Sequence, residues 1–144
     1  MSDDHARNPT TAYYVISGIF LTWNIIGLML YYQQMTMTPE MLASFDPVKA
    51  AFIQATPVWA NAAYATAVTF GVIASLLLLL RHKLAFGAFV VSFIGIVLQD
   101  LESFVVRDVI AVFGNEAFII PPIVFVIALI EIGYAKSVAN RYYR

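Results

Sequence analysis

The stretch from Val58 to Leu98 decides the fold, and it reads VWANAAYATAVTFGVIASLLLLL, then RHK, then LAFGAFVVSFIGIVL. The first apolar run covers residues 58–80. A helix of that length, rising about 1.5 Å per residue, can cross a hydrocarbon core about 30 Å thick. Arg81 and Lys83 at the junction are typical of a turn on the cytoplasmic side of a membrane. The stretch therefore predicts a hairpin of two membrane-spanning helices joined by a cytoplasmic turn.

The composition of the whole chain also indicates a membrane protein. Of its 144 residues, 61% are hydrophobic and only 12% are charged, and the mean hydropathy is +0.80. Soluble domains carry about 45–50% apolar and about 25% charged residues. A water-soluble fold of this size could not bury so much apolar surface, so we expect lipid to be the solvent for most of it.

Two further apolar runs complete a predicted set of four spans, at about residues 12–32, 58–80, 84–104 and 118–135. The third run is free of charge only as far as Leu98, which gives about 22 Å of helix, so we expect this helix to continue past Gln99. Gly114 and Asn115 mark a break before the fourth run. The sequence thus predicts a single all-α domain over residues 1–144, an integral membrane four-helix bundle.

The connection between the first two spans carries helix signals of its own. Thr38 precedes Pro39, and Asp46 precedes Pro47. Each pair fits an N-cap followed by a proline in the first helical turn. Apolar residues then recur at helical spacing over residues 48–55. We expect a short amphipathic helix in this first outer loop, either lying on the membrane or capping the bundle.

The distribution of basic residues predicts the orientation of the chain. One side of the predicted bundle would hold most of them, namely Arg7, Arg81, Lys83, Lys136, Arg141 and Arg144. Lys49 and Arg107 would lie on the other side. Because Lys and Arg in short loops accumulate in the cytoplasm, we expect both termini there and both long connections outside.

Several polar residues interrupt the spans, and most of them fall in the predicted outer half. Such residues usually face the bundle interior or water. Helical spacing allows them to line one outward-facing pocket for a small polar ligand, formed by Asn24, Tyr31, Asn61, Gln99, Asp100 and Glu102. The alternative is structural: amides that join helices contribute about 0.6–2 kcal/mol, and carboxylates near the outer edge reach headgroup water.

Glu131 is expected apart from this pocket, below the middle of the fourth span. Three roles stay open for it: a carboxylate that carries a proton, an ion pair with Lys83 or Arg81 at the inner turn, or a structural position. Arg107 is expected in an interfacial segment, with a pair to Asp100 or to Glu102 as an alternative.

Other classes of chemistry find no support in the residues present. The chain has no cysteine, which excludes disulfides, thiolate metal sites and cysteine nucleophiles. Its two histidines, His5 and His82, lie outside the apolar runs, so a haem held by two histidines is not expected. No phosphate loop, metal-spaced cluster or catalytic triad is visible. A net charge of −1 gives no indication of nucleic acid. We expect no catalytic residues, no metal and no cofactor, and a protein that is not an enzyme.

Six short features occur together along nearly the whole chain: Trp23-Asn24, Met37 to Glu40, Pro57 with Trp59, Leu78 to Arg81, Gln99, and Pro121. In this combination the chain resembles a group of small bacterial inner-membrane proteins with four predicted helices, commonly labelled "sugar transporter". The resemblance implies a multi-pass protein of the bacterial inner (cytoplasmic) membrane. This chain differs from that pattern at Asp100, Glu102 and Glu131, where apolar or aromatic residues are expected.

Two functions follow as expectations. The first is a transporter-like protein that binds a small polar ligand in the outward-facing pocket. Four helices leave little room for a private transport pathway, so we expect it to work as a homo-oligomer. The alternative is a non-transporting accessory or scaffold subunit whose helices pack against a larger membrane complex. In both cases the lipid bilayer is a partner.

Overall fold

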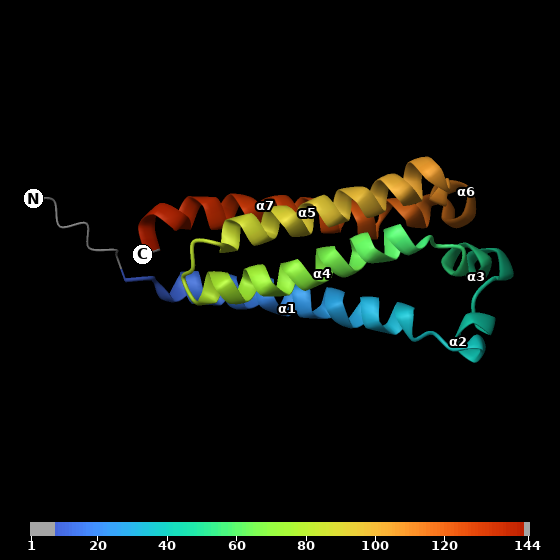
Figure 1. Ribbon diagram of the computed structural model, residues 1–144, viewed down its shortest axis with the longest axis horizontal. Coiled ribbons are helices and arrows are strands. Elements are labelled where there is room, and N and C mark those ends of the chain that lie inside the picture. The colour runs from blue at the N-terminus through green and yellow to red at the C-terminus, as the bar shows by residue number, and fades with distance from the viewer. Residues whose placement is uncertain (1–7, 143–144) are drawn as a thin grey trace, which may run out of the picture.

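Four long helices lie side by side in the computed structural model, which describes residues 8–142 (Figure 1). They are α1 (Thr11–Met35), α4 (Val58–Leu79), α5 (Ala85–Leu101) and α7 (Ile120–Tyr142). Each is long and apolar enough to cross a membrane when α5 is counted with the π-helical turn that follows it. The described residues contain no strand. The predicted all-α, four-helix membrane bundle is confirmed, and the fold is compatible with a multi-pass membrane protein.

The bundle has two different ends. At the turn end lie the start of α1, the connection between α4 and α5 at residues 80–84, and the last turn of α7 (Figure 1). At the other end, the cap end, lie the short helices α2 (Pro39–Ala43), α3 (Pro47–Gln54), η1 (Glu102–Val106), α6 (Val109–Phe113) and η2 (Gly114–Phe118). Arg7 and Arg144, which were predicted at the turn end, lie outside the described residues.

The first loop forms two short helices, α2 and α3, whereas the sequence predicted one short amphipathic helix there. Each begins at the proline that the sequence indicated. The hydroxyl of Thr38 accepts a hydrogen bond from the backbone N–H of Met41 at 3.3 Å, and the Asp46 carboxylate accepts one from that of Val48 at 2.9 Å. Helix α3 packs against α6. Of the two placements that the sequence left open, the structure thus shows α3 capping the bundle.

Two spans differ from their predicted bounds. Helix α7 continues to Tyr142 rather than ending near residue 135, because its last turns still pack on α1: Val138 is buried and the ring of Tyr142 contacts that of Tyr13. The regular part of α5 ends at Leu101, and the π-helical turn η1 follows it directly. Asp108 follows with a left-handed backbone, φ 52°, and its side chain caps α6. This sharp change of direction keeps α6 at the cap end.

Packing closes three sides of the bundle more tightly than the fourth. Helix α1 packs on α4, α4 on α5, and α5 on α7, whereas no extended backbone contact joins α1 to α7. Gly95 lets α4 and α5 approach closely, because a Cβ atom there would lie 2.7 Å from the carbonyl oxygen of Ala63. Near the turn end α1 and α7 meet through aromatic rings, Tyr13 with Tyr142 and Phe20 with Tyr134. Further along, residues of both helices line a cavity.

Candidate ligand-binding cavities

A cavity of about 340 Å³, the central cavity, lies among the four long helices. Each helix contributes to its wall. Trp23, Asn24 and Leu30 come from α1, Tyr64 and Val68 from α4, Gln99 and Asp100 from α5, and Val124 and Glu131 from α7. Protein sites for small molecules have volumes of about 300–1,000 Å³ and combine an apolar wall with a few polar groups. The central cavity has both properties.

The deepest polar contact of the central cavity joins α1 to α7. Asn24 and Glu131 each lie eleven residues from the cap end of their helix, Met35 and Ile120 respectively, which is about 16 Å along the axis. The side-chain amide of Asn24 donates to Oε1 of Glu131 at 2.6 Å. Only 3% of Glu131 is exposed. The two side chains therefore meet near the middle of the bundle.

Asn24 is held in this position by two more acceptors. Its amide nitrogen lies 2.9 Å from the carbonyl oxygen of Phe20 and 3.1 Å from the hydroxyl oxygen of Ser75 on α4. Gly71 provides the room, because a Cβ atom there would lie 2.1 Å from Oδ1 of Asn24. The amide thus links α1 to α4 and α7 at one point. Its orientation is fixed by groups outside the cavity wall.

Of acidic and basic residues, the wall of the central cavity contains acidic ones only. Asp100 and Glu131 line it, and none of its lining residues is lysine, arginine or histidine. Asn24 donates to Oε1 of Glu131. No described residue donates a hydrogen bond to the other carboxylate oxygen of Glu131 or to the carboxylate of Asp100. The hydroxyl of Ser92, which also lines the cavity, donates to the carbonyl oxygen of Ala67 at 2.6 Å. Two carboxylates are therefore available to a ligand.

The central cavity opens on the side of the bundle where backbone contact is sparse. Three of its lining residues are themselves about half exposed: Ile26 and Leu30 on α1, and Ile120 on α7. All three belong to the facing surfaces of α1 and α7. In a membrane, this opening would face the acyl chains.

A second cavity of about 250 Å³, the cap cavity, lies between the long helices and the short ones. Gln34, Asn61, Glu102 and Arg107 are among its lining residues. Tyr64, Gln99 and Pro121 line both cavities, so these three residues separate the two. The cavities are therefore neighbours along the bundle axis, and together they extend from the cap end to Glu131.

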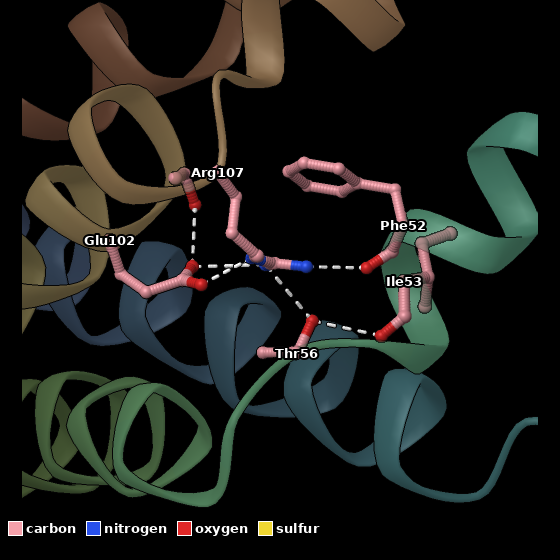
Figure 2. Close-up of polar contacts among 6 residues, drawn as sticks. Phe52, Ile53, Thr56, Glu102 and Arg107 are labelled. Carbon is pink, nitrogen blue, oxygen red and sulfur yellow. Dashed lines mark hydrogen bonds and ion pairs between the residues drawn. The ribbon is translucent and has the colours of Figure 1, made fainter.

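Arg107 lines the cap cavity and links η1 to α3 (Figure 2). Its Nη2 atom donates to Oε2 of Glu102 at 2.9 Å, and its Nε atom forms an ion pair with Oε1 of the same carboxylate. The guanidinium also donates to the carbonyl oxygen of Phe52 at 2.5 Å and to the hydroxyl of Thr56 at 3.1 Å. It lies 4.0 Å from the centre of the Phe52 ring.

The contacts of Arg107 provide partners for a backbone carbonyl and a buried carboxylate, which would destabilise the fold if they were left unpaired. The carbonyl of Phe52 belongs to the last turn of α3, where it has no partner within the helix, and the cation suits that negative end of the helix. The Glu102 side chain is only 1% exposed, and Arg107 neutralises it through one hydrogen bond and one ion-pair contact. A second link to α3, between Lys49 and Glu116 at 2.7 Å, is more exposed.

The structure divides the predicted pocket residues between the two cavities instead of gathering them in one. Asn24, Gln99 and Asp100 line the central cavity; Asn61, Gln99 and Glu102 line the cap cavity. Oδ1 of Asn61 is buried without a hydrogen-bond partner among the described residues. Tyr31 lines neither cavity, but its ring packs edge-on against Tyr64, with 5.1 Å between ring centres. The prediction of a single pocket was therefore wrong.

Glu131 was also misplaced. It does not pair with Lys83 or Arg81, but with Asn24, and it lies in the central cavity instead of below it. The error arose because the predicted span began at residue 118 and ended at 135, whereas α7 runs from Ile120 to Tyr142. Of the two alternatives for Arg107, the pair with Glu102 is the one found.

Three contributors were missed from the sequence. Ser75 orients Asn24, and its only signal was a hydroxyl within a leucine-rich run. Phe52 and Thr56 bind Arg107 through a backbone carbonyl, a ring and a hydroxyl. No local pattern marks residues for such contacts, because the partner is about fifty positions away. Among the described residues there is no cluster of three or more side chains that could hold a metal ion.

Comparison with known proteins adds no relative: no protein-family model, no curated protein and no solved structure matches this chain.

Proposed function

We propose that this protein is a small, transporter-like membrane protein that binds a small polar ligand in the central cavity. The observation that carries the proposal is the buried pair of Asn24 and Glu131 at the end of a cavity of about 340 Å³. Polar and ionisable groups are expensive inside a membrane, and there they commonly mark substrate or ion pathways. A purely structural pair needs no cavity beside it.

The asymmetry of the bundle supports transport over simple storage of a ligand. The half near the cap end contains both cavities. The half near the turn end is a packed core in which Tyr13, Leu78 and Phe89 are almost fully buried. A site at the middle of the bundle, with the turn end closed, is what one state of a carrier requires.

For localisation we propose the bacterial inner membrane, with the turn end in the cytoplasm. The proposal rests on the resemblance to small four-helix inner-membrane proteins and on the basic residues of the turn end, Arg81, Lys83, Lys136 and Arg141. A homo-oligomer would supply the helices that a single copy lacks for a complete pathway.

The proposal can be tested by mass spectrometry of the gently solubilised protein, which reports retained ligands, copies and partners together. Val124→Trp would fill the central cavity. Val126→Trp is the matched control, because Val126 lies on the same helix, is 53% exposed and does not line the cavity. We expect a small molecule to remain bound to the natural protein and to Val126→Trp, and to be absent from Val124→Trp.

Two results would contradict the proposal. One is a small molecule that is retained equally by both tryptophan variants, which would place its site elsewhere. The other is a stable complex with a larger membrane protein and no retained small molecule in any variant. That second result would instead support an accessory or scaffold subunit.

A further inference from the structure

We propose that the ligand of the central cavity is a small organic cation, an ammonium or guanidinium group attached to an apolar body. This inference rests on the proposed function, since it names the class of ligand for the same site. It follows from the acidic residues, the apolar wall and the opening of the cavity.

The charge of the site is unbalanced. Asp100 and Glu131 line the cavity, and no basic side chain does. Glu131 is 3% exposed, yet its only hydrogen-bond donor among the described residues is the neutral amide of Asn24. Its second carboxylate oxygen, Oε2, accepts no hydrogen bond from a described residue. Buried carboxylates are normally paired with a cation, and no basic side chain among the described residues pairs with this one.

The cap cavity provides an internal comparison. Its buried carboxylate, Glu102, is 1% exposed and is neutralised by Arg107 from the same chain. The chain therefore provides a cation for this buried carboxylate. The central cavity contains two carboxylates without such a partner. A ligand with a positive charge would complete that site electrostatically.

The remaining wall suits the body of such a ligand. Trp23 and Tyr64 line the cavity, and aromatic faces attract ammonium and guanidinium groups. Ile26, Leu30 and Val124 add apolar surface toward the opening between α1 and α7. An inorganic ion would leave this surface without a partner. A cation that carries an apolar group would contact the carboxylates and the apolar wall at the same time, and could enter from the acyl chains.

The probe is benzyltrimethylammonium, compared with p-toluenesulfonate, an anion of similar size, and with benzyl alcohol, which is neutral. Binding is measured by isothermal titration calorimetry on the purified full chain in dodecyl maltoside, an uncharged detergent, with empty micelles as the blank. We expect the ammonium to bind as a saturable ligand, and the anion and the alcohol to bind at least about tenfold more weakly.

The variants are Glu131→Gln and Asp100→Asn, which remove charge at nearly constant shape. Glu131→Gln keeps an oxygen to accept from Asn24, and Asp100 makes no hydrogen bond with a described residue, so both should fold. Each should weaken binding of the ammonium about tenfold or more. Glu40→Gln is the matched control, because Glu40 lies on α2 and lines neither cavity. Circular dichroism checks that each variant folds. If Glu131→Gln does not fold, binding of the ammonium to Asp100→Asn alone tests the inference.

The outcomes separate this inference from the proposed function. The cation is overturned if the alcohol or the anion binds as tightly, if neither carboxylate variant weakens the ammonium, or if the ammonium does not bind at all. In those cases a small molecule retained by the natural protein and lost from Val124→Trp would still support a binding site of another class. Loss of that difference would overturn the site itself.

Discussion

The side-chain amide of Asn24 on α1 donates a 2.6 Å hydrogen bond to the carboxylate of Glu131 on α7. This bond crosses the side of the bundle where no extended backbone contact joins the two helices. It is therefore a polar link between α1 and α7 at mid-height, with aromatic contacts nearer the turn end. Its strength bears both on the stability of the bundle and on the shape of the cavity.

The Asn24–Glu131 bond should be measurable as a coupling between the two positions. Asn24→Ala, Glu131→Ala and the double variant form a cycle in which we expect a coupling free energy of about 0.6–2 kcal/mol, the range for polar pairs in membrane bundles. Unfolding by sodium dodecyl sulfate in mixed micelles, followed by circular dichroism, provides the measurement. Thr22→Ala is the control on α1 and should have little effect, because among the described residues the exposed Thr22 hydroxyl bonds only to the carbonyl oxygen of Gly18. If the free-energy changes of the two single variants add up to that of the double variant, the bond does not hold the helices together.

Arg107 should be the most sensitive position of the cap end. Arg107→Ala leaves Glu102 buried without a counter-charge, and breaking a buried pair in this way costs about 3–5 kcal/mol. Arg107→Lys keeps the charge, but it cannot donate to Glu102, Phe52 and Thr56 at once, so we expect an intermediate loss. The free energy of unfolding and the rate of proteolysis within α3 report these effects.

Lys49→Ala is the comparison for Arg107. It removes the ion pair between α3 and η2, but Glu116 is 65% exposed, and pairs of this kind contribute about 0–1 kcal/mol. We expect Lys49→Ala to change stability by less than about 1 kcal/mol. If the two alanine variants were equally damaging, the burial of Glu102 would not be the reason for the importance of Arg107.

Gly95→Ala should separate α4 from α5. The added methyl group would lie 2.7 Å from the carbonyl oxygen of Ala63 and 2.8 Å from the nitrogen of Ala67, both of them backbone atoms. Overpacking of this kind costs about 1–3 kcal/mol. Gly87→Ala, on the same helix, meets no atom within 4 Å and should stabilise by about 0.5–1 kcal/mol through the better helix propensity of alanine. If Gly95→Ala lowers the melting temperature and Gly87→Ala raises it, contact between α4 and α5 is the cause of the loss at Gly95.

The proposed orientation can be tested directly because the chain contains no cysteine. His82→Cys places a single exposed thiol at the turn end, and Ser44→Cys places one at the cap end. With an impermeant maleimide on intact cells whose outer membrane has been made permeable, we expect Ser44→Cys to be labelled and His82→Cys to be protected until the inner membrane is broken. Labelling of His82→Cys alone in intact cells would reverse the orientation.

The sequence alone determined the features that depend on neighbouring residues. Four spans were predictable because the membrane sets a minimum length of apolar chain, and that length can be counted. The starts of α2 and α3 were predictable because Thr38 and Asp46 bond to backbone N–H groups only two or three residues away. The break at Gly114 was predictable because it depends on that residue alone. Gly114 adopts a φ of 56°, which glycine tolerates and other residues rarely adopt.

The tertiary structure alone decided which polar groups meet. Helices α1 and α4 are apolar around most of their circumference, so periodicity does not show which face of each helix packs inward. The axial offset of α1 and α7, which brings Asn24 to Glu131, depends on two long connections and on contacts between distant residues. The same holds for Arg107, whose partners Phe52 and Glu102 belong to different elements. Hydropathy therefore determined the four spans, whereas the rotation and offset of the helices divided the polar residues between two cavities.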